Sequence, residues 1–215
     1  EYVFMEASSH GLEEKRVSWL NFFGAIYTNL SHDHLDFHGN MENYFRSKRK
    51  LFRMLPKGAF ALTNVDDKYG VKILEGTRAQ PFSYGFPEDP NKVHFHGAIK
   101  KSDINGLVLS FNNIEIKSRL IGKFNAYNLL AVWSACSLLG FDMEKVKKIL
   151  EDVEPPNGRF QHFLSASGVL AIVDYAHKPD ALQNVLQTIK EINSAEALLP
   201  QKSKIISVFG CGGDR

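Results

Sequence analysis

Short apolar runs that alternate with helix-like stretches predict a succession of strands and helices in the first third of the chain. Residues 2–6, 25–30 and 59–63 are apolar runs of strand length. Over 41–55 the apolar side chains recur every three or four positions, which predicts a helix capped by Asn40. A short helix or turn is expected at 9–16 and a helix at 66–74. This alternation predicts an α/β fold with a mostly parallel sheet flanked by helices.

The pattern changes after residue 80. Residues 81–121 hold β-rich runs broken by Asn-Gly and Asn-Asn pairs, which predict a small antiparallel β elaboration. A helical stretch at 124–151 follows, with Gly140 placed as a C-cap, and then a linker rich in proline and glycine at 154–158. Beyond the linker the pattern predicts strands near 161–165 and 169–174, a helix over 179–193 and a strand over 204–209. We therefore expect a first domain at 1–157 and the start of a second, Rossmann-like α/β domain at 158–215.

The composition of the chain narrows the range of functions to be expected. The chain has 215 residues and a net charge of +2, from 26 basic and 24 acidic residues, which gives no reason to expect a nucleic-acid partner. No apolar run approaches the roughly 20 residues that span a bilayer, so no membrane role is expected. Two distant cysteines give no disulfide framework and favour a reducing, cytoplasmic setting. The strand-like start and the glycine turn at the end suggest a piece of a longer protein.

The densest chemistry follows the second predicted strand. His32, His34 and His38 lie within seven residues, interspersed with two aspartates. This spacing is close to the histidine run of zinc hydrolases of the metallo-β-lactamase type, but the third histidine comes one residue late. The loop is therefore expected to serve an active site, with a metal-dependent hydrolase as one reading.

Two further positions are candidates for metal chemistry. Glu6 ends the first predicted strand and is followed by hydroxyl side chains, an arrangement that suits Mg²⁺, although Ser8 is also a good helix cap. Lys48 lies on the apolar side of the 41–55 helix, where a lysine must be paired, extend to solvent or be chemically altered.

Polar groups at other predicted junctions suit a nucleotide. Asn125 and Asn128 open the helix that begins near 124, where either phosphate or nucleobase binding or simple capping is possible. Asp174 and His177 lie at a strand-to-helix junction, where open α/β sheets bind ligands, and Arg159 in the linker could reach a phosphate. The Gly210-Cys211-Gly212-Gly213 turn is only a weak echo of a dinucleotide loop.

Taken in order, these segments resemble the Mur ligase family, most closely its MurE type. The family consists of ATP-dependent ligases that build the peptide stem of peptidoglycan. The resemblance is carried by eight stretches along the whole chain: 5–12, 28–39, 41–45, 64–67, 124–131, 158–159, 174–182 and 209–215. Several such strings in one order are far more specific than any single motif. The family's phosphate loop and the motif that recognises the incoming amino acid are not among them.

The resemblance implies a role for each matched position. Glu6, His34 and Lys48 would hold two Mg²⁺ ions, with Lys48 carbamylated so that it presents a carboxylate. His34 and Lys48 would thereby serve catalysis. Ser8, Glu14 and Arg16 would contact the UDP-sugar substrate, although Glu14 stands where the family carries glutamine. The nucleotide would be gripped by Asn125, Asn128, Arg159, Asp174 and His177.

The resemblance also implies the reaction. The expected activity joins a diamino acid, meso-diaminopimelate or L-lysine, to UDP-N-acetylmuramoyl-L-alanyl-D-glutamate through an acyl phosphate, with ATP consumed and a monomeric enzyme. The isolated chain is expected to be inactive. The alternatives are another Mur-type ligase, a folylpolyglutamate synthetase, or the hydrolase built on His32, His34 and His38.

Overall fold

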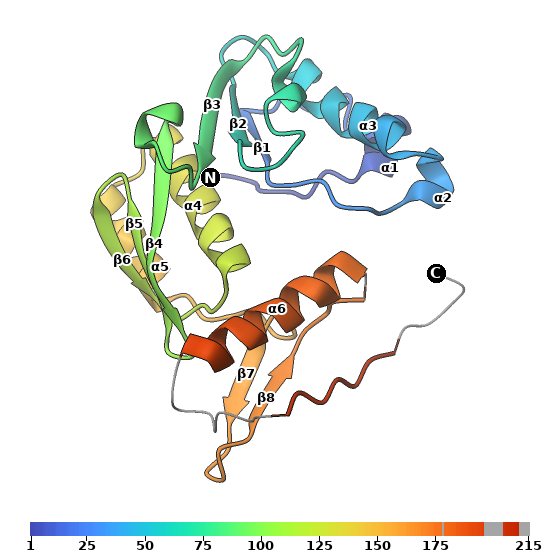
Figure 1. The fold of residues 1–215 in the computed structure, drawn as a ribbon. Coiled ribbons are helices and arrows are strands. Elements are labelled where there is room, and N and C mark those ends of the chain that lie inside the picture. The colour runs from blue at the N-terminus through green and yellow to red at the C-terminus, as the bar shows by residue number, and fades with distance from the viewer. Residues whose placement is uncertain (178, 196–203, 211–215) are drawn as a thin grey trace. The chain divides into compact units, whose positions relative to one another are not determined.

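A computed structural model describes residues 1–177, 179–195 and 204–210. Figure 1 shows how the helices and strands follow one another along the chain. The elements of the first part are α1 (Ser9–Glu13), β1 (Gly24–Tyr27), α2 (Leu35–His38), α3 (Met41–Met54), β2 (Phe60–Asn64), the 3₁₀ helix η1 (Lys72–Leu74), β3 (Gln80–Gly85) and the 3₁₀ helix η2 (Pro90–Lys92). They are followed by β4 (Phe95–Asp103), β5 (Gly106–Phe111), β6 (Ile114–Ser118), α4 (Lys123–Leu138), α5 (Met143–Asp152), β7 (Gln161–Leu164), β8 (Leu170–Val173) and α6 (Pro179–Ala195).

The main sheet has six strands in the order β1-β2-β3-β4-β5-β6. β1, β2, β3 and the start of β4 pair in parallel, with Ala25 opposite Ala61 and Leu62 opposite Phe82. β5 and β6 form an antiparallel hairpin whose turn holds Asn112 and Asn113, both with positive φ. The mostly parallel α/β sheet is thus confirmed, together with its antiparallel part.

The antiparallel part is smaller than the sequence predicted. β3 and the first residues of β4 fall within 81–121, yet both pair in parallel with their neighbours. The chain reaches β3 and β4 through η1 and η2, and such connections return it to the same end of the sheet and so permit parallel pairing. Tight two-residue reversals occur at Ile104-Asn105, between β4 and β5, and at Asn112-Asn113, between β5 and β6, where the Asn-Gly and Asn-Asn pairs predicted turns.

The chain folds as two compact units. The first comprises 1–97 and 127–143, and the second comprises 98–126 and 144–215. In the first unit α3 packs its apolar side onto β1 and β2, where Phe52, Leu55 and Ala61 are almost wholly buried. In the second unit Ile121, Phe160 and Ile192 form a smaller core. Within that unit β7 and β8 pair antiparallel, as expected from the two strand signals near 161–165 and 169–174.

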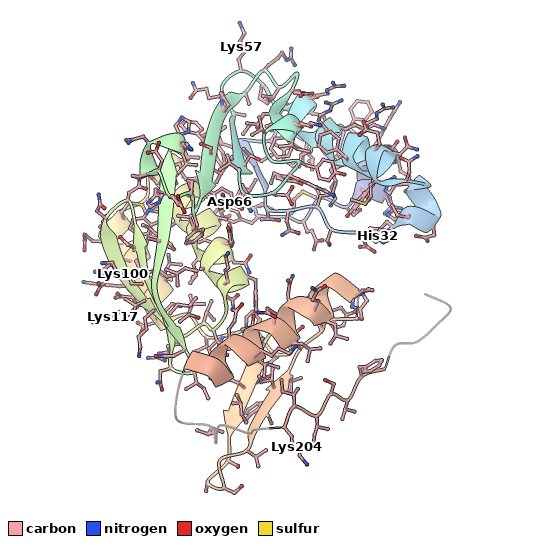
Figure 2. The ribbon with its side chains drawn as sticks, viewed as in Figure 1. His32, Lys57, Asp66, Lys100, Lys117 and Lys204 are labelled. Atoms are coloured by element: carbon pink, nitrogen blue, oxygen red, sulfur yellow. The ribbon has the colours of Figure 1, made fainter. Side chains whose placement is uncertain are left out.

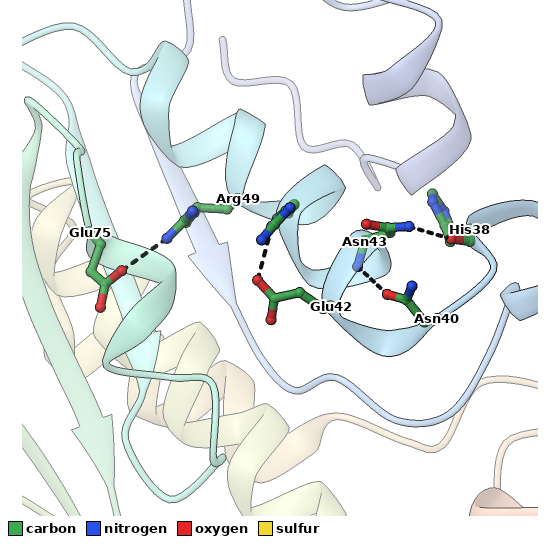
Figure 3. Close-up of polar contacts among 7 residues, drawn as sticks. His38, Asn40, Glu42, Asn43, Arg49 and Glu75 are labelled. Atoms are coloured by element: carbon green, nitrogen blue, oxygen red, sulfur yellow. Dashed lines mark hydrogen bonds and ion pairs between the residues drawn. The ribbon is translucent and has the colours of Figure 1, made fainter.

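Local chemistry fixes the ends of the helices. Asn40 is extended, and its side chain accepts the Asn43 amide at 2.9 Å, so it caps α3 as predicted (Figure 3). The expected helix over 124–151 is divided into α4 and α5 at Gly140, whose φ of +75° favours glycine. There the Gly140 and Phe141 amides donate to the carbonyls of Ser137 and Cys136.

Three predicted elements are wrong. Residues 2–6 form no strand, and Val3 and Phe4 are exposed, because no described strand lies beside them to complete a ladder. Residues 204–209 likewise form no strand, and Val208 is 95% exposed. Residues 66–74 form turns and the short η1 in place of the predicted helix. Side-chain hydrogen bonds to nearby backbone amides, described below, favour the turn.

None of the described helices is long and apolar enough to cross a membrane. Of the resemblance segments, Lys178 and residues 211–215 lie outside the described residues.

Candidate functional site

The turn after β2 fixes the loop that leaves β1. Asp67 accepts hydrogen bonds from the Tyr27 hydroxyl at 2.7 Å and the Leu30 amide at 3.2 Å. Asn64 donates to the Thr28 carbonyl at 2.8 Å. These hydrogen bonds hold Tyr27, Thr28 and Leu30, where the chain leaves β1. The histidine-rich loop therefore begins from a fixed position. The sequence predicted the loop but gave Asp67 no role.

His34 adopts an unusual backbone conformation at the start of α2. Its φ is 52° and its ψ is 28°, in the left-handed region that non-glycine residues rarely occupy. The preceding Asp33 braces it twice: one carboxylate oxygen accepts the His34 amide at 2.9 Å, and the other lies 2.9 Å from His34 Nε2. A strained backbone held by its own neighbour is a common sign of a functional position.

Aromatic rings pack around this point. The His10 ring lies 4.9 Å from His34 and 4.1 Å from Phe37. His38 stacks on Tyr44 with centroids 5.1 Å apart and planes 23° apart. His38 is 7% exposed, and its burial, followed by the charge of His10, lowers its pKa. A neutral His38 is therefore favoured inside this cluster.

Lys48 reaches the same region from α3. It is half-buried, its Nζ donates to the Ala7 carbonyl at 3.3 Å, and it lies 5.9 Å from the centroid of Tyr44. Burial, then the charges of Asp33 and Glu6, raise the pKa of Tyr44 to about 12. Two carboxylates, two histidines (His34 and His38) and one lysine thus gather around a single tyrosine ring, although Glu6 itself is exposed.

The donors in this cluster fit a hard cation only partly. Carboxylate oxygens such as those of Glu6 and Asp33 are the ligands that Mg²⁺ prefers. Yet the described residues contain no group of three or more His, Cys, Asp and Glu arranged to hold a metal ion.

The same finding counts against a zinc site on the three histidines. His38 Nε2 lies 2.8 Å from the Ser9 hydroxyl, and His34 Nε2 faces Asp33. His32 is exposed on the stretch between β1 and α2 (Figure 2). His34 and His38 thus share the aromatic cluster with His10 and Tyr44, but their Nε2 atoms face different partners.

The three residues expected to meet the UDP-sugar lie in and after α1. The Ser8 hydroxyl accepts the Gly11 amide at 3.0 Å, which is the helix-capping alternative. Glu14 and Arg16 form an exposed ion pair with each other. Both side chains reach solvent, so a polar ligand could contact them.

The predicted nucleotide residues of the second unit cluster around Tyr175. The Arg159 guanidinium lies 4.9 Å from the centre of the Tyr175 ring, and the His177 ring lies 5.0 Å from it. Asp174 accepts the amides of Phe160 and Ala176, both at 2.7 Å. These bonds order the junction after β8. Arg159, Tyr175 and His177 are exposed there and so are accessible to a ligand.

Asn125 and Asn128 occupy successive turns of α4. Asn125 donates to the Ile121 carbonyl at 2.8 Å, while Asn128 is exposed. Asn128 belongs to the first unit and Asn125 to the second.

Two family profiles match the chain. The Mur ligase middle domain matches residues 1–136, and the Mur ligase glutamate ligase domain matches residues 158–215. The chain belongs to the Mur ligase family. The predicted resemblance is confirmed, while the boundary at 157/158 stays a prediction.

Several named relatives are similar to this chain over nearly its whole length. The UDP-N-acetylmuramoyl-L-alanyl-D-glutamate--2,6-diaminopimelate ligase of Bacteroides thetaiotaomicron is 47% identical over all 215 residues, which span 43% of that protein. The ligase of the same name from Geobacter sulfurreducens is 41% identical over 99% of the chain and 42% of its own length. A solved structure of a ligase of that name, 31% identical, covers 86% of this chain and 39% of its own with a TM-score of 0.71. The chain thus spans less than half the length of these relatives.

Sequence reasoning missed several residues that organise the site. Asp67 follows a buried strand within an Asp-Asp pair, a position that could have marked it. Asp33 and Tyr44 lie inside the segments that carried the resemblance. Ser9 and Ser47 are ordinary small residues whose role emerges only from their contacts.

Proposed function

We propose that the protein containing this chain is an ATP-dependent ligase that adds 2,6-diaminopimelate to UDP-N-acetylmuramoyl-L-alanyl-D-glutamate during peptidoglycan synthesis. The relatives at 41–47% identity bear that name. The observation that carries the proposal is the half-buried Lys48 beside Ala7, in a cluster with Glu6, Asp33 and His34. A second Mur ligase with another amino-acid substrate is the nearest alternative.

The reaction forms one amide bond at the expense of one phosphoanhydride bond. A carboxylate oxygen of the substrate attacks the γ-phosphorus of ATP, which releases ADP and leaves an acyl phosphate. The amine nitrogen of the diamino acid then attacks the acyl carbon, loses a proton and expels phosphate. Bound Mg²⁺ would neutralise charge on the transferring phosphoryl group.

We assign the chain's residues to this reaction as follows. Glu6, His34 and Lys48 would hold two Mg²⁺ ions, with Lys48 present as a carbamate formed when its neutral amine adds CO₂ and loses a proton. The carbamate supplies the carboxylate that the described cluster lacks. Ser8, Glu14 and Arg16 contact the UDP-sugar. ATP is bound by Asn125, Asn128, Arg159, Asp174 and His177.

The exposed groups of the second unit suit this nucleotide role. The planar Arg159 guanidinium can bind a phosphate with two hydrogen bonds, and Tyr175 beside it offers an aromatic surface. We also propose that the enzyme works as a cytoplasmic monomer, with domains at 1–157 and 158–215.

The test is a ligation assay on the full-length protein with ATP, Mg²⁺, the UDP-dipeptide and diaminopimelate, followed by mass spectrometry of the product. Lys48→Ala should lower kcat/KM by about a hundredfold or more, because an electrostatic group next to the reacting phosphate is lost. Lys57→Ala is the matched control, since Lys57 is exposed on the connection between α3 and β2 (Figure 2). Equal activity of both variants would contradict the role of Lys48. Absence of any amide product from the wild-type protein would refute the ligase proposal.

A further inference from the structure

Ser9 lies at the centre of a small buried hydrogen-bond group. It is 1% exposed, and its hydroxyl lies 2.8 Å from His38 Nε2. Its carbonyl accepts the Ser47 hydroxyl at 2.8 Å, and Ser47 is wholly buried. We call Ser9, His38 and Ser47 the serine–histidine group.

This group joins the three segments that carry the proposed metal residues. Ser9 lies three residues after Glu6, His38 lies four residues after His34, and Ser47 directly precedes Lys48. The Asn43 side chain donates to the His38 carbonyl at 3.0 Å, which ties the end of α2 to α3 (Figure 3). The positions of all three segments thus depend on contacts with Ser9 or on α3.

Lys48 adds a contact of a different kind. Its ammonium donates to the Ala7 carbonyl, two residues before the carbonyl that Ser47 holds. Carbamylation would convert this cation into an anion and remove the attraction between ammonium and carbonyl. The Ser47 and His38 contacts involve no charge on Lys48, so they would persist.

We propose that Ser9, Ser47 and His38 are positioning residues that keep the segment around Glu6 in register with α3 whether Lys48 is an amine or a carbamate. This inference rests on the proposed ligase function for its consequence, but its structural part can be measured separately. This positioning role requires no contact between any of the three residues and the substrate or a metal ion.

The experiment compares Ser9→Ala and Ser47→Ala with Ser134→Ala in the full-length protein. Ser134 is a fitting control because it is also wholly buried and its hydroxyl donates to a carbonyl, that of Leu130 at 2.6 Å, within α4. All three variants lose one buried hydroxyl bond. Only the first two lose a contact between the Glu6 segment and its neighbours.

Two readouts separate positioning from general stability. Without added metal, amide hydrogen exchange in a peptide covering residues 5–12 should accelerate in Ser9→Ala and Ser47→Ala but not in Ser134→Ala. In the ligation assay the Mg²⁺ concentration for half-maximal rate should rise by about tenfold in the first two variants, the usual effect of removing a group that orients a metal ligand. At saturating Mg²⁺ their kcat should recover to within about threefold of the wild type.

Each outcome decides the proposal. Unchanged exchange in 5–12 would show that the serine–histidine group does not hold the segment, and the proposal would be wrong. Faster exchange with a Mg²⁺ requirement like that of Ser134→Ala would overturn its link to the metal residues. If the wild-type protein formed no amide, the ligase proposal would be refuted. The positioning role would then be tested by amide hydrogen exchange and by the Mg²⁺-induced rise in unfolding temperature.

Discussion

His38 shows how one buried side chain can link stability to pH. Its ring stacks on Tyr44, bonds to Ser9 and is held neutral by burial and by the neighbouring charge of His10. The pKa of His38 in the folded protein therefore lies below 6.5, its ordinary value. As pH falls through 6.5 the unfolded chain gains a proton that the folded protein resists, so the folded state loses stability.

We predict that His38→Gln reduces this loss of stability below pH 6.5. Glutamine has an amide nitrogen that can replace Nε2 opposite Ser9, and it does not titrate. The measurement is the free energy of unfolding in denaturant at several pH values between neutral and about pH 5, where the linkage is expected. His94→Gln is the control, because His94 hydrogen-bonds Ser83 at a more exposed position. If both variants followed the wild-type pH dependence, His38 would not be the group responsible.

At the scale of the element, the turn after β2 decides where the histidine loop begins. Asn64 and Asp67 hold Thr28, Tyr27 and Leu30, as described above. Gly70 closes this turn tightly: a Cβ there would lie 1.8 Å from the Asn64 carbonyl oxygen. The Gly70 carbonyl in turn accepts the buried Thr63 hydroxyl at 2.7 Å.

We predict that Gly70→Ala destabilises the fold by about 1–3 kcal/mol, because the backbone of Asn64 must move to admit the methyl group. Gly58→Ala should stay within about 0.5 kcal/mol, since nothing lies within 4 Å of the Cβ at that position. Urea unfolding of both variants measures the difference. Equal stability of the two would mean that the turn can relax at little cost.

The sequence predicted elements that are defined by their own residues. The helix over 41–55, its Asn40 cap and the break at Gly140 were found because spacing and capping chemistry are local. The helix over 66–74 was wrong because Asn64 and Asp67 accept the amides of Asp66 and Tyr69. The strands at 2–6 and 204–209 were wrong because a strand needs a neighbour, which an apolar run does not specify.

The residues of the candidate site also fall into two groups, those that the sequence indicated and those that it did not. The resemblance gave the residues that carry charge, such as Lys48 and His34. It gave no role to Ser9, although Ser9 lies in the matched segment 5–12, and it did not include Ser47, because a small buried serine matters only through the carbonyl or ring that it contacts. Long-range contacts of this kind appear only in three dimensions.

For the molecule as a whole, both family profiles show membership of the Mur ligase family, and the relatives of 41–47% identity bear the name of one ligase in it. The proposed metal residues Glu6, His34 and Lys48 lie in the first unit, and the exposed Arg159, Tyr175 and His177 lie in the second. Since the chain spans less than half of its relatives, amino-acid choice is a property to be measured on the full-length protein.

We predict that the full-length protein prefers meso-diaminopimelate to L-lysine by at least about a hundredfold in kcat/KM. Diaminopimelate carries a second carboxylate, and a site built to pair with it leaves buried polar groups unpaired when lysine binds. Competition assays with both amino acids in one reaction, read by product mass, measure the ratio directly. The Lys48→Ala variant is the internal control, because it should lower both rates together and leave the ratio unchanged. A preference for lysine would place the protein among Mur ligases with a different third residue, while the role proposed for Lys48 would stand.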